Sequence, residues 1–119
     1  MKLFTKQQYE RLKQNGQNRD KDHAPVVKLF MTGTGCTWLI SELDPENPDI
    51  AFGLCDLGVG FPEMGYVSLT EIKEAQGFLR FLERDLSFVG EYPLSVYARA
   101  ASSLEYIVTD TDTVKKYLK

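Results

Sequence analysis

The sequence is poor in the residues that build metal centres, nucleophilic triads and disulfide frameworks. Its 119 residues include two cysteines and one histidine. Cys36 and Cys55 lack the CxxC spacing of a zinc site or a thioredoxin-like motif. His23 lies in a polar stretch where nothing would desolvate or orient its ring. We therefore expect two reduced thiols, no histidine-rich metal site and no histidine-based catalysis.

Long apolar runs and an excess of positive charge are also missing. The apolar runs are only a few residues long, far below the roughly 20 residues of a membrane span. The chain turns polar directly after Met1, unlike the apolar core of a secretory signal. The net charge is −3, the opposite of the basic footprint that phosphate binding needs. The sequence thus predicts a cytoplasmic protein without membrane contact and makes nucleic-acid binding unfavourable.

Phosphate-binding motifs are absent as well. The glycine-rich stretches at 33–35 and 58–61 have neither GxGxxG spacing before a helix nor the lysine and hydroxyl of a P-loop. We interpret both stretches as turns and expect no cofactor.

Apolar residues, by contrast, are plentiful. Hydrophobic residues make up 43% of the chain and aromatic residues 12%. This content is enough for one core without disulfide or metal support, and 119 residues is the usual size of one domain. We expect a single domain over residues 1–119.

Three helices are indicated by their start signals. Thr5-Lys6-Gln7-Gln8 fits a capping box, and the helix that it opens should end at Asn15-Gly16. Ser68-Leu69-Thr70-Glu71 is a second capping box, with Gly77 as the stop signal. Pro93 and Ser95 introduce a third helix, which should run through Ala101.

Strands are predicted where β-branched and aromatic residues gather, at 26–31, 37–43, 50–57, 64–69 and 86–89. The loops between the first four are too short for crossover helices. The fold class is therefore α+β, with an antiparallel meander of four to five strands packed against two to three helices. The residues expected in the core are Leu12, Val27, Leu29, Ile40, Phe52, Leu54, Val67, Ile72 and Leu86.

Several segments, in their order and spacing, resemble a known family. They are the capped N-terminal helix, Val26-Val27-Lys28-Leu29-Phe30, Thr37-Trp38, Phe52-Gly53-Leu54-Cys55-Asp56, Glu63-Met64-Gly65-Tyr66-Val67-Ser68-Leu69 and Glu83-Arg84-Asp85-Leu86-Ser87-Phe88. Together they resemble the domain-of-unknown-function 2958 family, small bacterial proteins often carried by plasmids, integrative elements and phages. The likeness covers residues 1–101 and departs from the family at Phe78-Leu79-Arg80-Phe81-Leu82. Residues 102–119 lie outside it as a C-terminal extension. The family has no established activity, so the resemblance implies a fold and a gene neighbourhood and no catalytic residue.

Two carboxylates are the first candidate site residues. Strand alternation places Glu42 on the face of Trp38 and Ile40, and Asp56 on the face of Phe52 and Leu54. If the two strands pair, the carboxylates could face each other and hold magnesium or act as acid and base. The alternative is that each carboxylate caps a loop or pairs with Lys28 or Arg84.

The charged triplet Glu83-Arg84-Asp85 and three aromatic residues complete the candidates. One side of the triplet either carries a salt bridge into the sheet, which we favour, or presents charge to a partner. Phe61, Tyr66 and Trp38 could form an exposed aromatic patch of the kind that anchors protein interfaces. We expect Phe61 to be the exposed member and Trp38 to pack in the core.

These observations favour a non-enzymatic protein-binding module, an acidic accessory protein of a mobile element that docks through an aromatic and acidic surface. The partner is an unidentified protein, and the sequence leaves the oligomeric state open. The alternative is a magnesium-dependent hydrolase or nuclease that uses Glu42, Asp56 and the Glu83-Arg84-Asp85 triplet.

Overall fold

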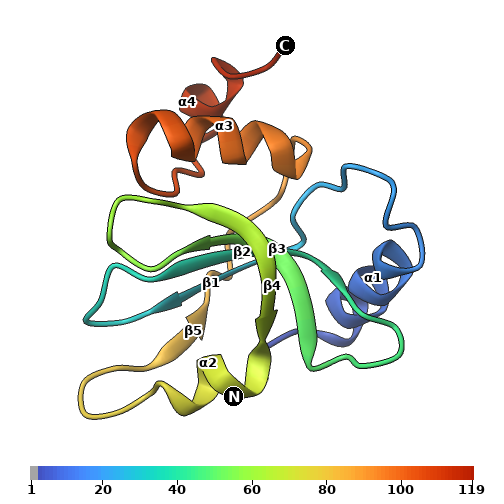
Figure 1. Cartoon of the computed structure of the whole chain (residues 1–119), viewed down its shortest axis with the longest axis vertical. Helices are drawn as coiled ribbons and strands as arrows, with labels where there is room; N and C mark the ends of the chain where they lie inside the picture. Colours follow the sequence, from blue (N-terminus) through green and yellow to red (C-terminus); the bar gives the residue numbers. More distant parts are fainter. Residues whose placement is uncertain (1–2) are drawn as a thin grey trace.

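A five-stranded antiparallel sheet with helices on both faces forms the fold of the computed structural model, which describes residues 3–119 (Figure 1). The strands are β1 (Val27–Met31), β2 (Thr37–Leu43), β3 (Ile50–Asp56), β4 (Glu63–Ser68) and β5 (Leu82–Arg84). The helices are α1 (Lys6–Gly16), α2 (Leu69–Glu74), α3 (Leu94–Leu104) and α4 (Thr111–Lys115). The strand order is β4-β3-β2-β1-β5, so the first four strands form the meander expected from the sequence and the α+β fold class is confirmed.

Capping side chains start α1 and α2 where the sequence predicts. The Thr5 hydroxyl accepts the Gln8 amide at 3.0 Å, and the Gln8 side chain accepts the Thr5 amide at 2.9 Å. Both interactions of the capping box are therefore present in α1. At α2 the Ser68 hydroxyl accepts the Glu71 amide at 3.2 Å. Since Ser68 is also the last residue of β4, the chain passes from strand to helix without a loop.

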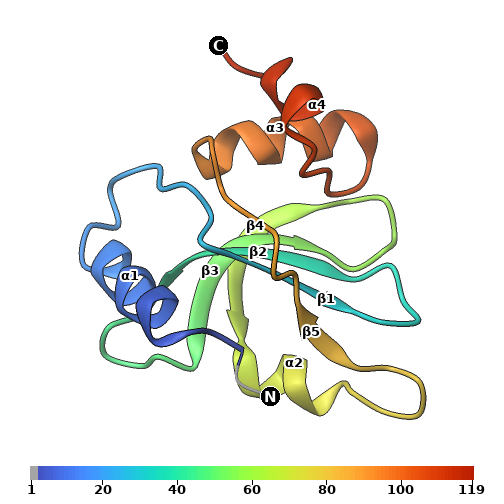
Figure 2. The same ribbon diagram turned by 180° about the vertical axis from the view of Figure 1, so that it is seen from behind.

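Two hydrophobic clusters cover the two faces of the sheet. One cluster joins the N-terminal segment, α1 and α2 to inward-facing residues of β1 and β2, among them Trp38 and Ile40. The other joins α3 and α4 to Leu39 of β2 and Leu54 of β3. Figures 1 and 2 show α3 and α4 together above the sheet, with α1 at its side and α2 below. Helices therefore cover both faces of the sheet, and the central strand β2 is buried from Trp38 to Leu43, polar residues included.

A glycine lets α1 lie directly on β2. A Cβ at Gly16 would sit 1.9 Å from the Leu43 carbonyl oxygen, so any side chain there would push the helix away. Asn15 donates its side-chain amide to the Ser41 carbonyl at 3.0 Å beside this contact. The end of α1, predicted as a helix stop, thus also fixes the helix on the sheet.

A β-bulge in β2 changes which residues share a face. Ile40 pairs with Gly53 and Glu42 pairs with Phe52, which leaves Ser41 as an extra residue. Beyond the bulge, Leu43 joins the cluster of Trp38 and Ile40. Glu42 instead shares the opposite face with its partner Phe52. The prediction that Glu42 lies on the face of Trp38 is therefore wrong.

The fifth strand lies earlier in the chain than predicted. Leu82–Arg84 forms β5 and pairs with β1 at the sheet edge, whereas the segment expected as a strand at 86–89 forms none and begins with a turn at Leu86 and Ser87. Asp85 causes the change, because its carboxylate accepts the Ser87 amide and hydroxyl, both at 2.9 Å, and bends the chain. Leu86 is consequently 83% exposed, and its predicted burial is wrong.

Most of the other core predictions hold. Those confirmed as buried are Leu12, Val27, Leu29, Ile40, Leu54 and Ile72, while Phe52 and Val67 are half-buried against the clusters.

The C-terminal residues add a helix that the sequence analysis did not predict. Asp110 caps α4 by accepting the Thr113 amide at 3.1 Å and the Thr113 hydroxyl at 2.8 Å. Val114 of this helix is fully buried against α3 and the sheet. Lys28 of β1 donates to the Thr109 hydroxyl at 2.8 Å. The segment expected as an extension therefore contributes to the second hydrophobic cluster.

Candidate functional site

Three loops meet at one end of the sheet, and they carry the candidate site. They are the β1–β2 loop (32–36), the β3–β4 loop (57–62) and the α2–β5 loop (75–81). The Cys36 thiol donates to the Leu57 carbonyl at 3.6 Å, which joins the first two. Thr32 and Phe81 join the first and third through two hydrogen bonds of 2.9 Å. Figure 1 shows the three loops at the left of the molecule, with the β1–β2 loop between the β3–β4 loop above and the α2–β5 loop below, and Figure 2 shows them from behind.

Large apolar side chains of two of these loops face solvent. We call this set the apolar end; its members are Leu57, Val59, Phe61, Phe78, Leu79 and Phe81, each more than half exposed. Phe61 is 78% exposed, as expected for a residue between Gly60 and Pro62, and Phe78 is 91% exposed. Monomeric soluble proteins seldom leave large apolar surfaces uncovered unless the surface contacts something. The apolar end is therefore the strongest candidate interaction surface in residues 3–119.

The α2–β5 loop presents its apolar residues on a tight, strained turn. Gly77 and Arg80 exchange backbone hydrogen bonds of 3.0 and 3.1 Å, so Phe78 and Leu79 form the tip. Leu79 has φ of 61°, a left-handed conformation that a branched apolar residue rarely adopts. Backbone strain of this kind is concentrated at functional sites. The turn holds two exposed apolar side chains outward at a cost in conformational energy.

The aromatic patch predicted from the sequence does not form as a unit. Trp38 is buried in the first cluster, as favoured, and Phe61 is exposed at the apolar end. Tyr66 is exposed on the edge strand β4, where its ring lies 5.0 Å from that of Phe52. Arg19 donates to the Tyr66 hydroxyl at 3.0 Å and lies over the ring, so Tyr66 anchors the loop that follows α1.

Glu42 is 7% exposed and lies beside this aromatic pair. A small recess of about 10 Å³, enough for about one water, is lined by Glu42, Phe52, Tyr66 and Arg19 among others. Burial raises the pKa of the Glu42 carboxyl above its ordinary value, and the nearby charges of His23 and Arg19 offset part of that rise. Glu42 is thus a desolvated carboxylate under an exposed arginine.

Asp56 serves a structural purpose at the other end of the strand pair. It is 3% exposed, and its carboxylate accepts the Gly58 amide at 2.8 Å and the Ile107 amide at 3.0 Å. Asp56 pairs with Thr37, whereas Glu42 pairs with Phe52, four residues away along β3. Four residues of strand span about 13 Å, so the two carboxylates cannot share a metal ion. The expectation that they could face each other is wrong, and the loop-capping alternative describes Asp56.

The Glu83-Arg84-Asp85 triplet is divided between the sheet edge and the following turn. Glu83 is exposed opposite Phe30, and Arg84 is half-buried opposite Leu29. Asp85 lies 3.8 Å from the Lys28 ammonium, which is the structural salt bridge favoured from the sequence. Burial alone would raise the pKa of the Asp85 carboxyl. The pKa is nevertheless lowered, because the carboxylate accepts hydrogen bonds from the Ser87 amide and hydroxyl and is attracted by the Lys28 charge.

The described residues contain neither a metal-binding cluster nor a membrane-spanning helix. Among residues 3–119, no group of three or more histidine, cysteine, aspartate or glutamate side chains could hold a metal ion. No helix in the described part is long and apolar enough to cross a bilayer. Cys36 and Cys55 are separate, half-buried thiols, and burial raises the pKa of Cys55 to about 11.

Sequence reasoning missed most of the apolar end. It selected Phe61, but it treated Phe78-Leu79-Arg80-Phe81-Leu82 only as a departure from the family pattern. A signal was available, because four apolar residues follow Gly77 within a segment too short for a helix. Such a run indicates either a buried strand or an exposed loop, and only the pairing of Gly77 with Arg80 decides for the loop.

The comparisons with known proteins agree with the resemblance seen in the sequence. No curated protein and no solved structure matches the chain significantly. One family model, described as "Protein of unknown function (DUF2958)", matches residues 3–108. The match extends past the expected limit at residue 101 and includes all of α3, Asp56 and its partner Ile107. Because the match covers most of the chain and leaves out only residues 1–2 and 109–119, the chain belongs to the DUF2958 family.

Proposed function

We propose that this protein is a non-enzymatic protein-binding module and that the apolar end is its contact surface. The observation that carries the proposal is the exposure of six large apolar side chains on loops that are joined by hydrogen bonds. In this proposal the protein acts in the bacterial cytoplasm as an accessory of a plasmid, phage or integrative element and modulates a host or defence protein. The mobile-element setting rests on the family resemblance.

The chemistry of the apolar end favours a protein partner. Aromatic anchors such as Phe61 and Phe78 supply most of the binding energy in many protein interfaces. The links from Thr32 to Phe81 and from Cys36 to Leu57 hold the loops in place, which reduces the entropy lost on binding.

Carboxylates flank the β3–β4 loop of the apolar end, whereas the α2–β5 loop carries the exposed Arg80. Glu63 is exposed directly after the β3–β4 loop, and a Cβ at Gly60 would lie 3.7 Å from the Glu105 carboxylate. A protein surface with an apolar recess and basic residues opposite the β3–β4 loop would complement this arrangement. Basic residues on the partner would also be attracted by the net charge of −3 on this chain.

The hydrolase or nuclease alternative has lost the pair of residues on which it was based. Its reaction required Glu42 and Asp56 on one metal ion or one substrate atom, and the register of β2 and β3 places them far apart. Asp85, from the third part of that proposed site, is engaged by Lys28 and Ser87. The binding module is therefore the function that the geometry favours.

Affinity capture from a bacterial lysate with matched variants tests the proposal. The test variant is Phe61→Ser/Phe78→Ser, which removes two exposed aromatic anchors of the apolar end. The control is Leu86→Ser/Val89→Ser, which removes two equally exposed apolar residues outside it. Mass spectrometry identifies what each protein captures. We expect one protein to be captured stoichiometrically by the wild type and the control and to be lost with the test variant.

Two results would overturn the proposal. Equal capture of that protein by the test variant would place the interface elsewhere. If the control variant lost capture to the same extent, binding would depend on non-specific contacts of exposed apolar residues and not on a defined surface. Thermal denaturation of both double variants confirms folding, since all four positions are exposed and surface substitutions usually change stability by less than about 0.5 kcal/mol.

A further inference from the structure

A groove separate from the apolar end lies between the N-terminal part of the chain and α2. Its volume is about 580 Å³, within the range of sites that hold small organic ligands. The residues that line it come from the segment before α1, from α1, from the β2–β3 loop and from α2; they are Leu3, Phe4, Thr5, Lys6, Tyr9, Pro48, Asp49, Leu69 and Lys73.

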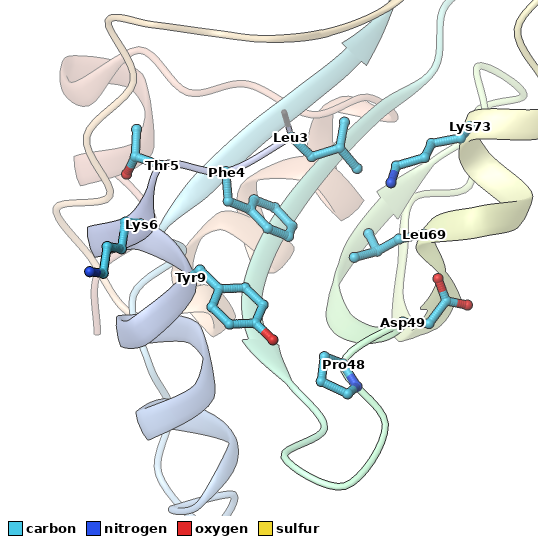
Figure 3. A pocket seen from close by; sticks show the side chains of 9 residues that line it. All are labelled: Leu3, Phe4, Thr5, Lys6, Tyr9, Pro48, Asp49, Leu69 and Lys73. Atoms are coloured by element: carbon cyan, nitrogen blue, oxygen red, sulfur yellow. The ribbon is translucent and has the colours of Figure 1, made fainter. Parts of the chain in front are cut away.

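The walls of the groove are mainly apolar. In Figure 3 the rings of Phe4 and Tyr9 form one wall, and Leu69 with Pro48 forms the other. Leu69 is buried, whereas Phe4 and Tyr9 are only partly buried and offer ring surface to the groove. Such walls fit the hydrocarbon or aromatic part of a ligand.

The charge at the groove is positive on balance, because two lysines and one aspartate line it, although the whole chain is acidic. Asp49 is committed to the start of α2, because its carboxylate accepts the Ser68 hydroxyl at 2.7 Å and the Thr70 amide and hydroxyl at 2.9 and 2.7 Å. These hydroxyl donors, with the charge of Lys73, hold the pKa of Asp49 below its ordinary value. The carboxylate is thus ionised with its acceptor sites largely occupied.

Lys73 is the cation that reaches into the groove. Figure 3 shows its side chain extending from α2 with Nζ toward Leu3 and Leu69, whereas Lys6 points away from the two aromatic rings. No carboxylate of residues 3–119 lies in ion-pair contact with the Lys73 ammonium. An ammonium above an apolar recess is a receptor for an anionic group on an apolar body.

We propose that the groove binds a small organic anion, with its carboxylate or phosphate on Lys73 and its apolar part between the Phe4 and Tyr9 rings and Leu69. This inference does not depend on the protein-binding function, since the groove shares no residue with the apolar end.

NMR titrations that follow the backbone amide and methyl signals test the site. They use three small molecules that share one phenylbutyl skeleton. The probes are 4-phenylbutanoate, 4-phenylbutyl phosphate and 4-phenylbutylammonium, so that only the head group changes. We expect saturable chemical-shift changes at Leu3, Leu69 and Lys73 with the carboxylate or the phosphate probe. The probe with the lower Kd identifies the preferred head group. The ammonium probe should bind at least about tenfold more weakly, because it would meet Lys73 as a like charge.

Variants at Lys73 separate charge from shape. Lys73→Met keeps the aliphatic stem and Lys73→Glu reverses the charge, and we expect affinity for the anionic probe to fall about threefold and about tenfold. Lys116→Glu, with the same change of net charge at an exposed position after α4, should leave the affinity unchanged. Equal binding of the ammonium probe, shifts outside the groove only, or equal losses with Lys73→Glu and Lys116→Glu would each overturn the proposal.

Discussion

The Asp56 carboxylate accepts the buried backbone amide of Ile107 at 3.0 Å, which ties the end of β3 to the chain that leaves α3. The same carboxylate accepts the Gly58 amide and so orders the start of the β3–β4 loop. One buried carboxylate therefore fixes both the helical layer on one face of the sheet and the loop that carries Phe61. A residue that resembled half of a catalytic pair in the sequence is an anchor of the fold.

Removing the Asp56 carboxylate should destabilise the protein. Asp56→Ala leaves the buried Ile107 amide without an acceptor, which costs about 1–3 kcal/mol of unfolding free energy. Asp56→Asn keeps one acceptor oxygen and should cost less. Urea denaturation measures both, with Asp20→Ala at an exposed position as the control. Equal midpoints for Asp56→Ala and Asp20→Ala would contradict the anchoring role.

Leu54 and Leu86 provide a direct test of which apolar residues form the core. Leu54 is 1% exposed between the sheet and α3, so Leu54→Ala should cost about 2–5 kcal/mol through lost burial and the cavity left behind. Leu86→Ala should change the unfolding free energy by less than about 0.5 kcal/mol, because its side chain is exposed. Chemical denaturation of the two variants checks the assignment, which reversed costs would refute.

The sequence predicted the elements that are specified by local chemistry. Thr5 and Gln8 cap α1 through side chains three residues apart, so the signal is complete in four residues. The β1–β4 meander follows from loops too short for any other connection. Trp38 and Ile40 were correctly assigned to the same buried face, since strand alternation holds up to that point.

The errors arose where distant contacts decide the local structure. The bulge at Ser41 depends on the pairing of β2 with Phe52 and on the Asn15 side chain of α1, neither of which is visible in the sequence of β2. It turned Glu42 to the opposite face. Likewise, Leu86 to Val89 alternates like a strand, but the carboxylate of Asp85 draws Ser87 into a turn. The apolar end needed the same kind of information, because its residues come from two loops that are far apart in the sequence.

Relief of strain at Leu79 should stabilise the protein. Leu79 adopts φ of 61°, and glycine accepts this conformation without a Cβ clash. In Leu79→Gly, relief of the strain should raise the unfolding free energy by about 1 kcal/mol. The greater freedom of glycine in the unfolded chain offsets part of this gain. Phe78→Gly, at the neighbouring turn position without positive φ, should give no gain. Thermal denaturation compares them, and a loss with Leu79→Gly would argue against strain.

Cys55 should react slowly with alkylating reagents while the protein is folded. Burial raises the pKa of Cys55 to about 11, so little thiolate forms near neutral pH and alkylation of the folded protein should be slow. Unfolding should remove the protection. Iodoacetamide labelling read by peptide mass spectrometry gives the rate at Cys55 with and without urea, and Cys55→Ser identifies the signal. Equal rates in the folded and unfolded protein would show that Cys55 is not protected.

Glu42 should make stability depend on pH in a predictable direction. Burial raises the pKa of its carboxyl above the ordinary value of 4.5, so the folded state binds this proton more tightly than the unfolded state. The resulting stabilisation is complete below the unfolded pKa and is lost as pH rises through the folded pKa. Glu42→Gln has no such proton to lose. The difference in unfolding free energy between Glu42→Gln and the wild type should therefore shift in favour of the variant between about pH 4 and about pH 7. Denaturation curves at the two pH values measure the difference. Glu10→Gln, on the exposed face of α1, is the control for replacing a carboxylate that is not buried.

A shift in favour of the wild type would contradict the prediction. It would mean that the charges of Arg19 and His23 outweigh burial and stabilise the ionised form of Glu42.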